Sequence, residues 1–214
     1  MRISILCNNL AHPVVPYLRD WIRVNRDNHE IELIESIRDA SWGDILFLVS
    51  CSEKVLEADR ARYCKTLILH ASDLPNGRGW SPHVWDIIEG ADHITLSLLE
   101  AEDVIDSGNI WKKLRLKIPK HALWSEINQI LFNAEIELID FALRNFASII
   151  PKIQDLSTAS SYRRRRTYED SRVDPNRTIA EQFDLLRVCD PVRFPAFFDY
   201  LGHRYTLKLE KANE

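Results

Sequence analysis

The chain has 214 residues and a mass of 25.0 kDa, which is enough for one globular unit with a sizeable core. Hydrophobic residues make up 45% and charged residues 28%, so the composition excludes a wholly disordered chain. The net charge of -4 argues against a dedicated nucleic-acid binder, because neutralising phosphates requires a basic surface. No apolar run approaches the roughly 20 residues that cross a bilayer. We therefore expect neither nucleic acid nor membrane among the partners.

The amino terminus and the cysteines predict a cytoplasmic protein without a metal centre. The first residues, MRISILCNNLAHPVVPYL, contain a short apolar stretch without a small-residue cleavage site, and we interpret them as a strand rather than a signal peptide. The four cysteines form no CxxC pair and have no metal-ligand spacing. Reduced thiols are therefore expected.

The first 120 residues alternate between strand-like and helix-like patterns. Strands are predicted at residues 2–7, 30–35, 44–49, 66–69 and 93–99. Helices are predicted between them at residues 14–25, 53–63 and 83–89. Strands that alternate with helices at this pace predict an α/β fold with a mostly parallel sheet.

A long helix and a small extension follow the predicted sheet. Apolar residues recur at i+3 and i+4 spacing over about residues 122–149, and Pro151 ends this helix. Residues 152–178 are predicted to be a polar linker, which contains four consecutive arginines at 163–166. A short helix at 179–188 and a hairpin of two strands, 196–200 and 205–209, complete the chain. The chain is therefore divided into a main domain, 1–150, and a C-terminal extension, 151–214.

Two loops carry the polar residues that point to a function. His70 follows a buried strand and opens a loop rich in Gly and Pro, at the edge where open α/β sheets bind ligands. The helix and strand that come next lead to a second loop, which contains Asp106. We expect this order of elements to bring Asp106 beside His70. The dinucleotide motif GxGxxG and the phosphate motif GxxxxGK[ST] are both absent, so a ligand would be held by another device.

These two loops resemble the signature of the folate-dependent formyltransferases, and within them that of the sugar N-formyltransferases. The family pattern N-x-H-x-S-x-L-P-x-x-R-G-x-x-P reads I-L-H-A-S-D-L-P-N-G-R-G-W-S-P here, and the later D-x-G reads D-S-G. The matching residues are His70, Ser72, Leu74, Pro75, Arg78, Gly79, Pro82, Asp106 and Gly108. His70 and Asp106 are 36 residues apart, which agrees with the family spacing. The resemblance covers about residues 44–145 and implies a Rossmann-like formyltransferase core.

The likeness is closer to a subgroup that acts on 4-amino sugars for pseudaminic-acid-type glycans. This subgroup shares the string H-x-S-D-L-P-x-G-x-G-W-S-P, and it has an apolar residue where the wider family has Asn. That residue is Ile68 here. Because the family's Asn helps polarise the formyl oxygen, backbone N–H groups or Ser72 would have to supply the missing hydrogen bond. Residues 166–174 resemble the element R-x-P-E-D-S-x-I-D of sugar N-formyltransferases, with Tyr168 in place of Pro.

The resemblance implies an enzyme that moves a formyl group from N10-formyltetrahydrofolate to the amine of a UDP- or GDP-linked 4-amino-4,6-dideoxy sugar, for surface glycan biosynthesis. In this reaction His70 is the proton carrier and oxyanion donor, and Asp106 orients its imidazole. The implied folate-binding residues are Ser50, Cys51, Val55, Leu56, Asp103, Val104 and Ile105. The implied substrate-binding residues are Ser72, Asp73, Arg78, Gly79, Trp80 and Ser81.

Other interpretations stay open at this point. A glycinamide-ribonucleotide-type transformylase or a formylfolate hydrolase would use the same chemistry, although the element at 166–174 argues against both. A catalytically impaired relative that only binds folate or a nucleotide sugar would account for Ile68. His83 and His93 are interpreted as surface or structural residues, and the four arginines as a solvated stretch that suits a nucleotide diphosphate. The edge of the terminal hairpin favours a homodimer.

Overall fold

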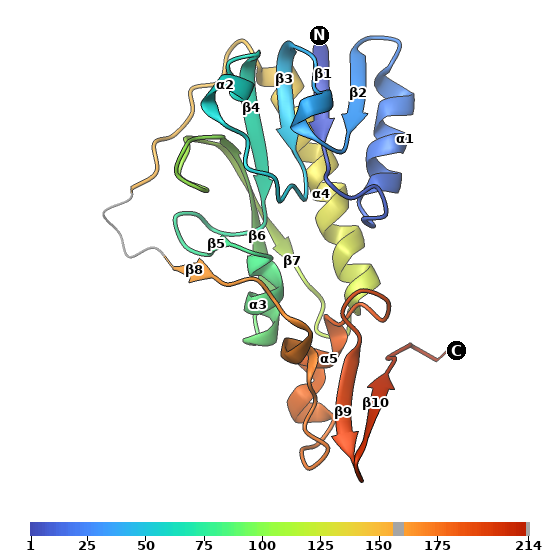
Figure 1. Ribbon diagram of the computed structural model, residues 1–214. Helices are drawn as coiled ribbons and strands as arrows, with labels where there is room; N and C mark the ends of the chain where they lie inside the picture. Colours follow the sequence, from blue (N-terminus) through green and yellow to red (C-terminus); the bar gives the residue numbers. More distant parts are fainter. Residues whose placement is uncertain (156–160, 213–214) are drawn as a thin grey trace.

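A six-stranded sheet forms the centre of the fold, in the order β2-β1-β3-β4-β6-β7 (Figure 1). The computed structural model describes residues 1–155 and 161–212. The strands of this sheet are β1 (Arg2–Leu6), β2 (Glu30–Ile34), β3 (Gly43–Leu48), β4 (Tyr63–His70), β6 (His93–Glu100) and β7 (Ile110–Lys117). The first four are parallel, whereas β6 pairs antiparallel with both β4 and β7. The predicted α/β fold with a mostly parallel sheet is therefore confirmed.

Strand β3 shows why such a sequence forms a strand that is covered on both faces. Ile45 and Phe47 belong to the larger core, whereas Leu46 and Leu48 belong to a smaller core. This alternation follows from the two-residue period of a strand, which sends neighbouring side chains to opposite faces of the sheet. All four side chains are buried. Burying each of them stabilises the fold by about 1.5–3 kcal/mol.

Three helices pack against the larger core, namely α1 (Val15–Asn25), α3 (Pro82–Ile88) and α4 (Trp124–Asn145). Pro16 lies in the first turn of α1, where its missing N–H costs no hydrogen bond. The Trp21 indole N–H donates to the Asp140 carboxylate at 2.7 Å and so joins α1 to α4. The smaller core is completed by the 3₁₀ turn η1 (Ile37–Asp39) and by Val55.

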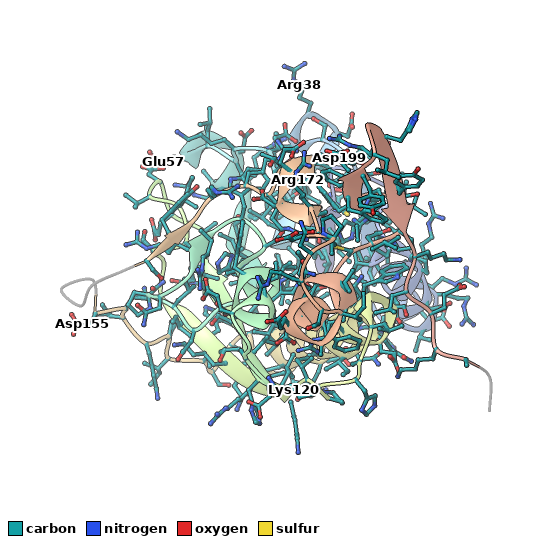
Figure 2. All side chains as sticks on the ribbon, turned by 90° about the horizontal axis from the view of Figure 1, so that it is seen from below. Arg38, Glu57, Lys120, Asp155, Arg172 and Asp199 are labelled. Atoms are coloured by element: carbon teal, nitrogen blue, oxygen red, sulfur yellow. The ribbon has the colours of Figure 1, made fainter. Side chains whose placement is uncertain are left out.

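Residues 168–212 of the C-terminal extension lie at the end of the molecule near α3 (Figure 1). Its elements are β8 (Tyr162–Arg163), η2 (Tyr168–Ser171), η3 (Ala180–Gln182), α5 (Phe183–Arg187), β9 (Ala196–Tyr200) and β10 (His203–Leu207). Arg187 is fully buried and donates from Nη1 to the Pro119 carbonyl at 3.1 Å, which fixes α5 to the core. Arg172 and Asp199 lie side by side in Figure 2, and their 2.5 Å ion pair joins the segment after η2 to the hairpin.

The structure differs from the sequence prediction in several elements. The predicted helix at 53–63 is reduced to the single turn α2 (Glu57–Arg60), because the Asn8 side chain accepts hydrogen bonds from the Ser52 and Glu53 N–H groups and holds that segment as a loop. Strand β7 was not predicted, since its exposed, charged side chains are typical of an edge strand.

The predicted β-hairpin is confirmed, although its second strand begins at His203 rather than at Tyr205. Part of the predicted linker, 156–160, lies outside the described residues. Among the helices of the described ranges, none combines the length and the apolar composition that crossing a bilayer requires.

Helix α4 carries one carboxyl group in its buried apolar face. Glu135 lies between Leu131 and Leu138 on this face and is only 4% exposed. Its Oε2 atom has no hydrogen-bond partner among the described residues. Burial raises the pKa of Glu135 to about 8, because the ionised form loses its hydration. The group is therefore neutral in the folded protein below that pH.

We predict that Glu135→Gln removes a pH-dependent loss of stability. Between the unfolded pKa of 4.5 and the folded pKa of about 8, the folded state keeps a proton that the unfolded chain releases. The wild-type free energy of unfolding should therefore fall as pH rises through this range, by about 1.4 kcal/mol per pH unit from this group. Urea unfolding at a series of pH values measures the slope.

Glu137→Gln is the matched control, because Glu137 is exposed on the same helix. Other groups, such as the half-buried His12, are the same in both variants, so the difference between the variants isolates Glu135. Equal pH slopes for E135Q and E137Q would contradict the prediction.

Candidate active site

His70 ends strand β4 and lies in the buried end of a cavity. Its side chain is held because β4 is buried between β3 and β6, and the residue is 8% exposed. The loop after β4 folds back so that the Gly77 carbonyl lies 2.9 Å from His70 Nε2. An imidazole that donates from Nε2 to this carbonyl leaves Nδ1 as the ring atom that exchanges a proton.

Asp106 lies beside this ring atom. Its Oδ1 is 3.6 Å from His70 Nδ1, and the residue is 6% exposed. The loop between β6 and β7 is fixed by Gln154, whose side-chain amide donates to the carbonyls of Asp106 and Gly108 at 3.0 and 2.7 Å. The structure thus brings together the two loops that the sequence predicted to meet.

Gly79 connects this pair to the arginine-rich segment. Its N–H donates to Asp106 Oδ2 at 2.9 Å, so both carboxylate oxygens of Asp106 have a defined direction. Gly79 has φ +97°, and a Cβ atom there would lie 2.4 Å from the Arg163 carbonyl oxygen. The position therefore requires glycine. Residues Arg78 and Gly79 form β5, which pairs in parallel with β8, and the two lie side by side in Figure 1.

His70 and Asp106 line a cavity of about 520 Å³ at the carboxyl edge of the sheet. One group of lining residues comes from the side of the smaller core: Leu48, Cys51, Val55, Ile68 and Ala101. Another group comes from the side of the larger core: Val84, Ile87, Ile127, Leu131 and Phe132. The cavity therefore extends across the edge of the sheet, and it borders both cores.

Backbone strain is concentrated around this cavity. Four non-glycine residues in the described ranges have positive φ, and three of them line the cavity: Ser50 at 48°, Ser81 at 43° and Asp106 at 55°. The fourth, Leu201, is in the turn of the terminal hairpin. Left-handed non-glycine residues cost about 1–3 kcal/mol each and cluster at functional sites. Their positions support this cavity as the candidate active site.

Many of the predicted site residues border the cavity. Besides His70 and Asp106, these are Ser50, Cys51, Val55, Asp103, Ile105, Gly79, Trp80 and Ser81. They come from the loops after β3, β4 and β6, which are neighbouring strands. Because β6 is antiparallel to β4 and ends beside Leu67, the loop after β6 must turn back to bring Asp106 to 3.6 Å from His70. Burial raises the pKa of the Cys51 thiol to about 11, so this cysteine is a neutral wall of the cavity rather than a nucleophile.

The other predicted site residues, Leu56, Val104, Ser72, Asp73 and Arg78, lie outside the set that lines the cavity. Leu56 and Val104 are 54% and 60% exposed on the surface. Ser72 is buried and lies against Gly77, since a Cβ atom added to Gly77 would be 2.9 Å from the Ser72 Cβ. Asp73 forms an ion pair with Lys113 at 2.5 Å. Ser72 therefore does not supply the hydrogen bond that Ile68 lacks.

Several cavity residues were missed or misinterpreted from the sequence. His83, interpreted as a surface or structural residue, lines the cavity, and its Nδ1 is buried without a partner among the described residues. Burial, and then the positive charges of His70 and Arg166, lower the pKa of His83 to about 4. Burial likewise lowers the pKa of His12 to about 4. His12 lies in the loop after β1, and His70 is the last residue of β4, so a place at the carboxyl end of a parallel strand was the available signal.

The arginine run has two different environments. Arg163 pairs with Asp86 and Glu89, and Arg164 pairs with Asp170. The next two residues line the cavity instead. The Arg165 guanidinium lies 4.9 Å over the Trp80 ring, and that of Arg166 lies 5.7 Å from the Phe194 ring. Stacking on a ring leaves the edge of a guanidinium free to bind an anion.

The chemistry available here is proton transfer beside an enclosed ligand. A buried imidazole with a carboxylate at one nitrogen and a carbonyl at the other can take a proton from a reacting group and hold it as an imidazolium. The described residues contain no cluster of His, Cys, Asp or Glu side chains that would hold a metal ion. The buried His70–Asp106 pair favours acid–base chemistry carried out by side chains.

Comparison with known proteins agrees with this geometry. No family model matches the chain. The chain is 32% identical, over 108 residues, to the methionyl-tRNA formyltransferase of Rickettsia bellii, an alignment that covers 50% of this chain and 35% of that relative. The chain spans about a third to a half of the length of the curated relatives that it matches.

Solved structures share the fold over almost the whole chain. A methionyl-tRNA formyltransferase from Clostridium thermocellum has a TM-score of 0.81 at 20% identity, covering 95% of this chain and 90% of that one. A sugar N-formyltransferase from Shewanella has a TM-score of 0.71 at 16% identity, covering 100% and 99%. HypX from Aquifex aeolicus, in complex with tetrahydrofolic acid, has a TM-score of 0.77 at 20% identity, covering 95% and 36%. The chain thus shares the fold of these formyltransferases, and half of its sequence is similar to part of a methionyl-tRNA formyltransferase.

Proposed function

We propose that this protein transfers a formyl group from N10-formyltetrahydrofolate to the amino group of a nucleotide-linked 4-amino-4,6-dideoxy sugar. The observation that carries the proposal is the His70–Asp106 pair, buried in a cavity of a formyltransferase fold. In this proposal residues 1–150 are the catalytic domain, and the extension, residues 151–214, adds part of the acceptor site.

The loops after β3 and β6 would hold the formyl donor. Ser50, Cys51, Val55, Asp103 and Ile105 combine apolar walls with exposed loop backbone, as small-molecule pockets do. The donor supplies an electrophilic formyl carbon. A neighbour of the same fold binds tetrahydrofolic acid, which supports a folate site in this fold.

The acceptor nitrogen forms a bond to the formyl carbon, and the bond between that carbon and N10 of the donor breaks. The imidazole of His70 would take the proton that the amine loses and return it to N10, so that tetrahydrofolate leaves. Its Nδ1 faces Asp106 at 3.6 Å, and the Asp106 carboxylate stabilises the imidazolium that results. The Gly77 carbonyl and the Gly79 N–H fix the directions of the ring and of the carboxylate, so little reorganisation is needed during the reaction. Ile68 lines the cavity without a hydrogen-bonding side chain, which leaves backbone N–H groups to stabilise the formyl oxygen.

Arginine side chains at the cavity favour an anionic acceptor. Arg165, Arg166 and Arg193 all line it, and the first two stack on Trp80 and Phe194. Guanidinium groups bind phosphate oxygens with paired hydrogen bonds, so a nucleotide diphosphate fits this wall. The acceptor amine would then lie toward His70.

Methionyl-tRNA is a second candidate acceptor, because the curated relatives are named methionyl-tRNA formyltransferases. The charge of this chain argues against it, since residues 151–214 contain 12 Lys and Arg against 10 Asp and Glu. The solved structures do not separate the two acceptors, since the Shewanella sugar N-formyltransferase aligns over 99% of its length and the Clostridium thermocellum methionyl-tRNA formyltransferase over 90%.

The acceptor is tested by incubating the protein with N10-formyltetrahydrofolate and a panel of amines. The panel contains UDP- and GDP-linked 4-amino-4,6-dideoxy sugars, methionyl-tRNA and glycinamide ribonucleotide. We expect formylation of a nucleotide sugar only, detected by mass spectrometry. Formylation of methionyl-tRNA instead would contradict the proposed acceptor, and folate binding without formylation of any amine would indicate a catalytically impaired relative.

We predict that His70→Ala and Asp106→Asn each lower kcat by at least about 100-fold, because each removes part of the proton carrier. Steady-state kinetics with the formylated acceptor measure the loss. His93→Ala is the matched control, since His93 lies on β6 and does not line the cavity. Turnover near the wild-type rate in either site variant, at unchanged thermal stability, would exclude the assigned roles.

We predict that Arg165→Gln raises KM for the nucleotide sugar by about 10-fold and leaves KM for the formyl donor unchanged. The expected cause is the loss of a charged hydrogen bond to phosphate. Arg164→Gln is the neighbouring control, because Arg164 pairs with Asp170 and does not line the cavity. The idea fails if both variants bind the nucleotide sugar as the wild type does.

A further inference from the structure

Glu135 is a buried polar residue that has no role in the proposed reaction as described above. It is 4% exposed, its Oε2 lacks a partner among the described residues, and it lines the same cavity as His70 and Asp106. Leaving a buried acceptor without a hydrogen bond costs about 1–3 kcal/mol. An apolar residue on this face of α4 would avoid that cost. The carboxyl group is therefore expected to form a hydrogen bond with a molecule that enters the cavity.

The surroundings of Glu135 describe the shape of such a partner. Leu131 and Phe132, on the same helix, are each 3% exposed and line the cavity with Ile87 of α3. These side chains form an apolar wall. Phe132 also contacts His12 edge-on, with ring centroids 5.9 Å apart. The wall therefore suits a flat or saturated ring that packs an apolar C–H face against it. Glu135 would accept a hydrogen bond from one polar substituent of that ring.

Other cavity atoms have unused hydrogen-bonding capacity of complementary kinds. Arg166 Nε and His83 Nδ1 are also buried and lack partners among the described residues. Arg166 Nε offers a donor, Glu135 offers an acceptor, and the neutral His83 ring offers one of each. Three unused polar atoms in an otherwise apolar wall match a ring that carries several hydroxyl or amino groups. A donor pocket for a planar pterin is lined by a different set of loops, after β3 and β6.

We infer that Glu135 is a substrate-positioning residue, whose carboxyl oxygen accepts a hydrogen bond from an O–H or N–H group of the acceptor's amino-sugar ring. This inference rests on the proposed function and names the part of the acceptor that reaches α4. The hydrogen bond would hold the ring against Phe132 while the arginines hold the phosphates, so that the amine stays directed toward His70.

The test compares Glu135→Gln and Glu135→Leu with the exposed control Glu137→Gln, using the UDP-linked 4-amino-4,6-dideoxy sugar as the probe. In E135L we expect KM for the sugar nucleotide to rise by about 10- to 100-fold, because the ring loses its hydrogen bond. KM for the formyl donor should stay unchanged. E135Q keeps a carbonyl acceptor, so it should recover most of the affinity and show a smaller rise. E137Q should match the wild type.

A 3-deoxy analogue of the same sugar nucleotide identifies the group that is bound. If the 3-hydroxyl is the partner, its removal weakens binding to the wild type and has no further effect in E135L. If the amine is the partner, the analogue weakens binding equally in both proteins. Urea unfolding of each variant separates these effects from loss of the fold.

Failures of the two claims are distinguishable. Formylation of the probe with equal sugar-nucleotide KM in the wild type and E135L would overturn the role of Glu135 and leave the proposed function intact. A wild-type protein that formylates no nucleotide sugar would overturn the proposed function and this inference with it.

Discussion

The whole site depends on the two contacts of the Asp106 carboxylate, one for each of its oxygens. One faces His70 Nδ1 at 3.6 Å, and the other accepts the Gly79 N–H at 2.9 Å. Gly79 in turn is paired with Arg163 of β8, so a single carboxylate joins the end of β4, the β6–β7 loop and the C-terminal extension. Loss of this carboxylate would remove one link between three segments that are distant in sequence. The same contact therefore sets the catalytic pair and attaches the arginine-rich wall to the core.

The position of the cavity at the sheet edge separates two tasks. Loops on the side of the smaller core, after β3 and β6, provide the predicted donor pocket. Helices α3 and α4, on the side of the larger core, provide the proposed ring-binding wall that contains Phe132 and Glu135. His70 lies on the strand between these two sides, which is the place that the proposed transfer requires. Glu135 Oε2 and His83 Nδ1, which lack partners among the described residues, both lie on the proposed acceptor side.

The sequence was informative wherever a local pattern decides the structure. The apolar runs of β1, β3 and β4 and the i+3, i+4 pattern of α4 predicted those elements correctly. The order of strand, loop, helix and strand predicted that Asp106 lies beside His70, which the structure confirms. Edge strand β7 was missed because its outward face is charged. The length of helix α2 was overpredicted because the Asn8 side chain accepts hydrogen bonds from the N–H groups of residues 52 and 53 and holds them as a loop. A local sequence pattern does not encode such a long-range contact.

Site residues were harder to predict than the fold. Glu135 belongs to the apolar face of a predicted helix and is the one charged residue on that face. This pattern predicts a helix but does not indicate that Glu135 lines a cavity. His83 was interpreted as a surface or structural residue, because no local pattern indicates that it lines a cavity. Ser72 matches the family motif, yet the turn at Gly77 buries it away from the ligand. Each of these outcomes depends on tertiary packing, which periodicity does not encode.

A structure of the protein with bound tetrahydrofolate tests the central claim most directly. The account predicts the pterin between the loops after β3 and β6, with N10 within about 3.2 Å of the His70 ring or linked to it through one water. A folate bound at another surface, or within the cavity with N10 directed away from the His70–Asp106 pair, would contradict it.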